Sequence, residues 1–144
     1  MIFALGIDHT GRTTLFSEAT RILISAMESR SVRRLIAIIG VGAGETRGHG
    51  GWLYDWIIQP LFTRHRYADK ERQEALIAAS KLDWTIVRPA PFRDDCAPGP
   101  LQVHTRVERD TVLRRVSRAE VATFVLDQLT NTEYLRQRPF IGHP

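Results

Sequence analysis

Short apolar runs alternate along this chain with longer amphipathic segments. The runs Ile2–Leu5, Leu35–Ile39 and Trp84–Arg88 are typical of buried strands, because residues covered on both faces of a sheet need no polar alternation. Between them, segments 13–29 and 69–80 place apolar residues at helical spacing. Strands that alternate with helices predict an α/β fold, with the three strands paired in parallel in chain order and the helices on the faces of the sheet.

The first helix is predicted to bury a single apolar stripe. Either Thr13 or Thr14 is expected to cap its start. The stripe consists of Leu15, Phe16, Ala19, Ile22, Leu23, Ala26 and Met27.

A third helix has the clearest boundary in the sequence. Ser117 and Glu120 have the spacing of a capping box, in which each side chain accepts from the other residue's backbone N–H. Val116 and Val121 occupy the positions of a hydrophobic staple. We therefore expect a helix that begins just after Ser117.

The remaining segments are less regular. Residues 40–51 are rich in glycine and are expected to form a loop, and 52–62 is compatible with a short helix. Segment 103–116 alternates weakly and predicts a strand or hairpin, with an antiparallel strand as one possibility, while 139–142 predicts a last short strand.

Composition bounds the class of protein. The chain has 144 residues, 43% of them hydrophobic and 25% charged, which is typical of one globular domain over residues 1–144. It lacks both a long apolar span and a signal-peptide pattern, so we expect a cytoplasmic protein with no membrane partner. Cys96 is the only cysteine, which excludes an internal disulfide and a cysteine-cluster metal site.

The net charge of +4 does not by itself indicate nucleic-acid binding. The basic residues are scattered and interspersed with acids, whereas a nucleic-acid surface gathers them on one face. The five histidines lack metal-ligand spacing and are interpreted as ordinary surface or loop residues, and no metal is expected.

Two glycine patterns could hold phosphate. Residues 6–13 have the spacing of a phosphate loop, but Arg12 replaces the lysine that such loops use. Gly40, Gly42 and Gly44 are spaced G-x-G-x-G, which differs from the dinucleotide fingerprint. We interpret the first as a strand-to-helix turn and the second as a flexible rim.

The most informative stretch is YADKERQEALIAASKLDWTIVRPAPF, residues 67–92. It resembles the NmrA-like, NAD(P)-binding branch of the atypical short-chain dehydrogenase/reductases, the group that contains biliverdin-IXβ/flavin reductase-like proteins. The stretches VRRLIAIIGVGAG and VSRAEVATFVLDQL also fit that family. The resemblance extends from Ile2 to about Gly142.

The resemblance implies a partial Rossmann-like fold, a truncated doubly wound parallel sheet of three to five strands. Ile2–Leu5 would match the family's fourth strand, so the chain would correspond to the C-terminal half of the domain, without the pyrophosphate loop. The implied cofactor is NADP or NAD. Gly6 would lie near its adenosine side and Lys70 at the nicotinamide ribose. The loop beside the nicotinamide would comprise Pro89, Ala90, Pro91 and Phe92.

Two departures from the family pattern bear on catalysis. Ile39 stands where the family often has a serine. Tyr67 precedes Lys70 by three positions and not by the four of the wider superfamily's Tyr-x-x-x-Lys pair. Tyr67 and Lys70 remain the candidate catalytic residues, and the alternative for Lys70 is a solvated helix lysine beside Glu74.

Three functions stay open. The chain could be a truncated NAD(P)-binding oxidoreductase-like protein with weak dinucleotide binding and no strong catalysis, which acts as a binding module. It could instead be a reductase completed by oligomerisation or a partner chain, or a regulatory or nucleic-acid-associated NmrA-like module. Because Ile2–Leu5 would be an apolar edge strand, we expect a homodimer through residues 2–27.

Overall fold

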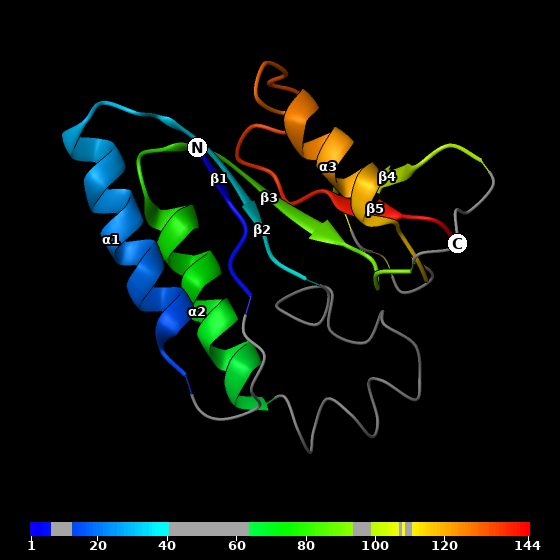
Figure 1. Ribbon diagram of the computed structural model, residues 1–144, viewed down its shortest axis with the longest axis horizontal. Helices are drawn as coiled ribbons and strands as arrows, with labels where there is room; N and C mark the ends of the chain where they lie inside the picture. The colour runs from blue at the N-terminus through cyan, green and yellow to red at the C-terminus, as the bar shows by residue number, and fades with distance from the viewer. Residues whose placement is uncertain (7–12, 41–63, 94–98, 107, 109–110) are drawn as a thin grey trace.

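The computed structural model describes residues 1–6, 13–40, 64–93, 99–106, 108 and 111–144, with no side-chain description for 64–67. Figure 1 shows a mostly parallel sheet with helices on both faces. The strand order across the sheet is β1-β2-β3-β5-β4. In that order the strands are Ile2–Phe3, Arg34–Ile38, Asp83–Pro89, Phe140–Gly142 and Gln102–His104.

The predicted order of the first three strands is confirmed. Strand β1 pairs in parallel with β2, where Ile2 lies opposite Ile36. Strand β2 pairs in parallel with β3 along its whole length, from Arg34 opposite Asp83 onward. The weakly alternating segment contributes β4, which runs antiparallel to β5 at the far edge. The fold is therefore α/β and Rossmann-like, as expected.

Helices α1 (Leu15–Ser29) and α2 (Arg64–Ala79) lie side by side on one face of the sheet, and α3 (Arg118–Asp127) covers the other (Figure 1). Successive right-handed crossovers that progress in the same direction across a parallel sheet place their helices on the same face. Thus the first two predicted helices share a face, and the second face is left to α3.

Strand β2 explains why the sheet has two cores. Its residues point alternately to opposite faces. Leu35 and Ala37 pack with residues of α1 and α2 such as Met27. Ile36 belongs to the cluster on the α3 side, with Phe124 among its members.

The prediction of one buried stripe on α1 was wrong in part. Phe16 and Met27 are buried, but Leu15 is 44% and Ile22 71% exposed. The polar residue Thr20 is fully buried in their place. Helix α1 packs against α2 as well as the sheet. Because α2 covers part of α1, the buried side of α1 does not coincide with its most apolar side.

Two helix boundaries bear on the site. Helix α2 begins at Arg64, earlier than the predicted 69, so Tyr67 is inside it. The capping box of α3 is confirmed, with the Glu120 N–H donating to Ser117 Oγ at 3.2 Å and the Ser117 N–H donating to Glu120 Oε2 at 2.8 Å. Val116 and Val121 share one core cluster, as the staple predicts.

Several predictions lie outside the described residues: the helix at 52–62, the glycine loop beyond Gly40, Cys96 and positions 7–12 of the phosphate-loop spacing. Within the described ranges, no helix is long and apolar enough to cross a membrane. Among those same residues, no group of three or more His, Cys, Asp or Glu could hold a metal ion.

Candidate functional site

The sequence-predicted cofactor residues gather at one edge of the sheet. Because β1, β2 and β3 are parallel, their carboxyl ends meet at the same edge, which lies at the bottom of Figure 1. Gly6 follows β1, Gly40 follows β2 and Pro91 follows β3. In open α/β sheets this carboxyl edge is where ligands bind.

Lys70 of α2 reaches this edge. Its Nζ lies 5.2 Å from the centre of the Phe16 ring, which is a cation–π distance. A Cβ at Gly40 would lie 3.9 Å from the same Nζ, and among the described residues it would meet no other non-neighbouring atom within 4 Å. The ammonium therefore stands between the first turn of α1 and the end of β2.

Glu74, which the sequence offered as a partner for Lys70, points into the interior. It forms ion pairs with Arg88 of β3 and with Arg138, whose Nε lies 2.6 Å from Glu74 Oε1. Glu74 and Arg88 are both buried. This network ties α2 to the sheet directly below the candidate site, and nothing in the residue spacing predicted it.

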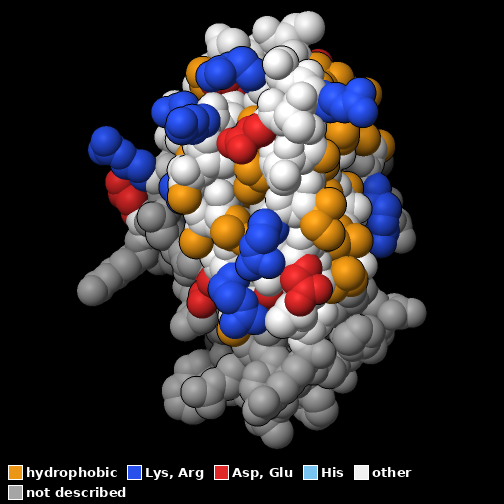
Figure 2. Space-filling model, turned by 90° about the vertical axis from the view of Figure 1, so that its left-hand side faces the viewer, with side chains coloured by type: hydrophobic (Ala, Val, Ile, Leu, Met, Phe, Trp, Pro, Cys, Tyr) orange, Lys and Arg blue, Asp and Glu red, His pale blue; other side chains and the backbone are white. Residues whose placement is uncertain are grey.

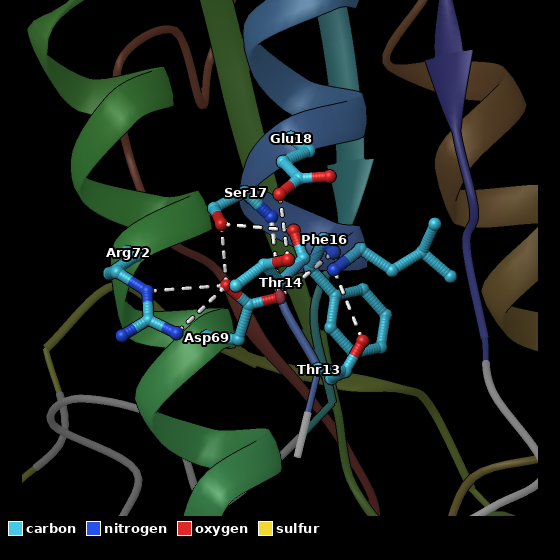
Figure 3. Close-up of polar contacts among 8 residues, drawn as sticks. Thr13, Thr14, Phe16, Ser17, Glu18, Asp69 and Arg72 are labelled. Carbon is cyan, nitrogen blue, oxygen red and sulfur yellow. Dashed lines mark hydrogen bonds and ion pairs between the residues drawn. The ribbon is translucent and has the colours of Figure 1, made fainter.

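Asp69, adjacent to Lys70, caps helix α1 from α2 (Figure 3). Its side chain is completely buried. Oδ2 accepts from the Phe16 N–H at 2.9 Å and from the Ser17 N–H at 3.4 Å, and Oδ1 accepts from Ser17 Oγ at 2.6 Å. Arg72 completes the set, with its NH2 atom 3.2 Å from Oδ1.

The cap on α1 was expected from Thr13 or Thr14, and the structure confirms that prediction only in part. Thr14 is the N-cap residue but makes no side-chain cap. Its Oγ1 donates to Glu18 at 2.7 Å, while Thr13 Oγ1 accepts from the Leu15 N–H at 3.1 Å. The carboxylate of Asp69 thus occupies the helix terminus where a phosphate would sit.

The predicted nicotinamide loop divides into two parts. Pro89 and Ala90 are buried, and the Ala90 N–H donates to Ile141 O at 2.8 Å. Pro91 and Phe92 are exposed, and the Arg118 guanidinium lies 5.2 Å from the centre of the Phe92 ring. The first two residues therefore belong to the core, and only Pro91 and Phe92 face outward.

His143 corrects the expectation that each histidine is an ordinary surface or loop residue. Its side chain is 3% exposed, and its Nε2 lies 2.7 Å from Glu120 Oε1. The backbone N–H of Ser117, the His143 ring and the Ser117 hydroxyl together lower the pKa of Glu120 to about 2. This cluster fastens the end of β5 to the start of α3. A single histidine in a C-terminal strand gave no sequence signal for it.

A pocket of about 480 Å³ lies at the opposite end of the sheet, away from the predicted residues. It is lined by the end of α1, the turn before β2, and Lys81 and Leu82. In parallel sheets ligands bind at the carboxyl end of the strands and not at the amino end, so we place the candidate site at Gly40 and Lys70.

A sequence model of the family described as NAD(P)H-binding matches residues 1–132. The chain belongs to this NAD(P)H-binding family. This match agrees with the NAD(P)-binding family that the sequence resembles. No curated protein matches the chain.

Solved structures share the fold of this chain. A Bacillus halodurans protein assigned as an NAD-dependent epimerase/dehydratase is 22% identical, with a TM-score of 0.76 over 99% of this chain and 63% of its own. ChuY, an anaerobilin reductase from Escherichia coli O157:H7, is 23% identical, with a TM-score of 0.68 over 99% of this chain and 63% of its own.

A third structure contains a cofactor. A short-chain dehydrogenase/reductase from Veillonella parvula, solved in complex with NADP, is 17% identical, with a TM-score of 0.68 over 92% of this chain and 60% of its own. At such identities the likeness establishes the fold alone. The chain spans about three-fifths of the length of these three proteins.

Proposed function

We propose that this chain forms the nicotinamide side of an NAD(P)(H) site at the carboxyl edge of β1, β2 and β3. The observation that carries the proposal is the Lys70 ammonium beside Gly40, at the edge where the family's fold receives its ligand. Lys70 donates a hydrogen bond to a ribose hydroxyl, Gly6 lies on the adenosine side, and Pro91 and Phe92 flank the nicotinamide.

Gly40 supports this assignment through its lack of a side chain. Within the described part of the chain, Lys70 Nζ is the one non-neighbouring atom within 4 Å of a Cβ at this position. A sugar ring can approach the strand end there, as close backbone approach to a ligand is a recurrent use of glycine. At Gly6, a Cβ would likewise meet no described atom within 4 Å.

By themselves, the 144 residues bind the dinucleotide weakly in this proposal. Phosphate binding in such folds depends on a glycine loop at a free helix N-terminus. Here the terminus of α1 is already occupied by Asp69. We therefore expect a dissociation constant for NADPH weaker than about 0.1 mM, because the contacts that hold the pyrophosphate are not offered by α1.

Strong catalysis is not part of the proposal. Tyr67 and Lys70 are three positions apart within α2, so they occupy neighbouring positions on its surface. They are the candidate pair for proton transfer to a carbonyl substrate. Ile39 replaces the hydroxyl that would bind that carbonyl, and it is fully buried, so it offers the substrate no polar contact.

Calorimetric titration with NADPH tests the proposal. We expect the wild-type chain to bind NADPH with a dissociation constant in the submillimolar to millimolar range. Lys70→Ala should bind at least about threefold more weakly, because it loses one charge-assisted hydrogen bond. Lys81→Ala should bind with the wild-type affinity. Micromolar binding would contradict the weak-binding claim. Equal affinity of Lys70→Ala and the wild type would remove Lys70 from the site.

A homodimer through residues 2–27 is the assembly that the proposal favours. Strand β1 is an edge strand with Ile2 39% exposed, and Ile22, at the midpoint of α1, is 71% exposed. Figure 2 shows hydrophobic side chains on the face that carries α1, among charges of both signs. A two-fold axis at Ile22 pairs α1 with α1 of the second copy. Because this face carries charges of both signs, acidic groups of one copy can face basic groups of the other.

A further inference from the structure

We propose that Asp69 is a positioning residue for Lys70, a role that rests on the function given to Lys70 above. Asp69 holds the first turn of α1 against α2. In doing so it fixes the aromatic ring against which the Lys70 ammonium stands. Asp69 itself is fully buried and offers no atom to a ligand.

The burial of Asp69 requires that its charge be compensated. A carboxylate removed from water is costly unless hydrogen bonds replace its hydration. Phe16 and Ser17 supply three of those bonds, from two backbone N–H groups and one hydroxyl. Arg72, one turn along α2, adds an ion pair to these three hydrogen bonds. Most of the compensation thus comes from α1, so the carboxylate and the helix terminus stabilise one another.

Phe16 connects the carboxylate with the ammonium, and Figure 3 shows its contact with Asp69. Its backbone N–H donates to Asp69, and its ring lies 5.2 Å from Lys70 Nζ. Two consecutive residues of α2 therefore hold one residue of α1 from two sides. Phe16 is only 1% exposed, so its ring cannot shift without disturbing its surroundings.

The placement of Lys70 follows from this arrangement. A lysine side chain has four rotatable bonds and takes up many positions in water. Here the ring of Phe16 bounds the ammonium on one side, and the end of β2 at Gly40 bounds it on the other. Removal of the Asp69 charge frees the first turn of α1 to move. The Phe16 ring then no longer holds the Lys70 ammonium in place.

Competitive labelling of lysine amines measures this placement directly, because Lys70 and Lys81 are the only lysines. Lys81 is exposed, lies at the other end of the sheet and provides the internal reference. In Asp69→Asn and Ser17→Ala we expect the labelling rate of Lys70 relative to Lys81 to rise about two- to fivefold, the factor that loss of a cation–π contact corresponds to.

Two control variants separate positioning from a general loss of stability. Arg72→Ala removes the exposed partner of Asp69 and leaves its bonds to α1 in place. Ser117→Ala weakens α3 on the opposite face of the sheet. The Lys70/Lys81 ratio should stay at its wild-type value in both. An unchanged ratio in Asp69→Asn and Ser17→Ala, or an equal rise in the controls, would overturn the positioning role.

The same variants distinguish this role from the proposed function. If the labelling ratio rises in Asp69→Asn while NADPH affinity is unchanged, Asp69 positions Lys70 but Lys70 does not bind the dinucleotide. If both the ratio and the affinity change in Asp69→Asn but neither changes in Arg72→Ala, both proposals hold. Asp69→Ala, which removes the acceptor of the Phe16 and Ser17 N–H groups, should show the largest rise in the ratio if it folds.

Discussion

Gly142 of β5 packs directly against Ala90, and a Cβ at position 142 would lie 2.6 Å from the Cβ of Ala90. The same atom would lie 2.9 Å from the carbonyl oxygen of Arg115. Real side chains do not approach this closely, so only glycine fits. Through this contact the last strand determines where the chain leaves β3 for the candidate site.

Gly142→Ala is therefore expected to destabilise the protein by about 1–3 kcal/mol, the usual cost of forcing one extra carbon into a packed core. The measurement is the free energy of unfolding from urea titration. Gly6→Ala is the matched control, because a Cβ there meets no atom of the described residues within 4 Å. Equal stability of Gly142→Ala and Gly6→Ala would show that β5 does not constrain Ala90.

The ion pairs of Glu74 give a second prediction. Glu74→Ala leaves Arg88 buried beside an empty position, and breaking a buried pair in this way costs about 3–5 kcal/mol. Asp83→Ala is the comparison, because Asp83 pairs with Arg33 at the surface, where Arg33 is 64% exposed. Solvent screens that pair, so no measurable loss of stability is expected. Urea unfolding of both variants checks the contrast, and similar losses would contradict it.

Glu120 makes stability depend on pH in acid. Hydrogen bonds from Ser117 and His143 lower its pKa in the folded protein from 4.5 to about 2. A depressed carboxyl pKa contributes stability that is fully present above the unfolded pKa and is lost as pH falls toward the folded value. The wild type should therefore exceed Glu120→Gln in free energy of unfolding at pH 6, and the difference should shrink between about pH 4.5 and pH 2.

Urea unfolding of wild type and Glu120→Gln at several pH values provides the check. A difference that stays constant from pH 6 to below pH 3 would mean that the carboxylate charge is not what holds the end of β5 to α3. His143→Ala should reproduce part of the loss, since it removes one of the contacts that lower the pKa of Glu120.

The proposed dimer predicts a specific effect at Ile22. Ile22→Lys places a charge on each side of the two-fold contact, while the monomer fold tolerates it because the position is exposed. Light scattering at micromolar concentration should give about twice 16.4 kDa for the wild type and the monomer mass for Ile22→Lys. Leu126→Lys on α3, also exposed, should stay dimeric. A well-folded wild-type monomer would exclude this interface.

The sequence predicted those elements whose signal is local. Unbroken apolar runs identified β2 and β3, and the spacing of Ser117 and Glu120 identified the start of α3. The family resemblance was confirmed by the match to the NAD(P)H-binding family, while the role that it implies for Lys70 stays a prediction. Each of these depends on residues close together in the chain.

What the sequence did not predict depends on distant partners. The bonds of Asp69 to Phe16 and Ser17 span more than fifty positions, so the spacing of residues within one helix cannot predict them. Local spacing likewise does not predict the pair of Glu74 with Arg138, 64 positions apart, or that of Glu120 with His143, 23 positions apart. The buried arc of α1 was misjudged for a related reason, because the position of α2 decides it.

The central claim is that the dinucleotide binds at the carboxyl edge of the sheet, and amide chemical shifts of the isotope-labelled protein titrated with NADPH test it most directly. The account predicts that the largest saturable shifts fall on Gly6, Gly40, Lys70 and Phe92, and that Lys70→Ala reduces them. The opposite pocket, represented by Val32 and Lys81, should not respond. Saturable shifts confined to Val32 and Lys81, with Gly40 and Lys70 unchanged, would contradict the account.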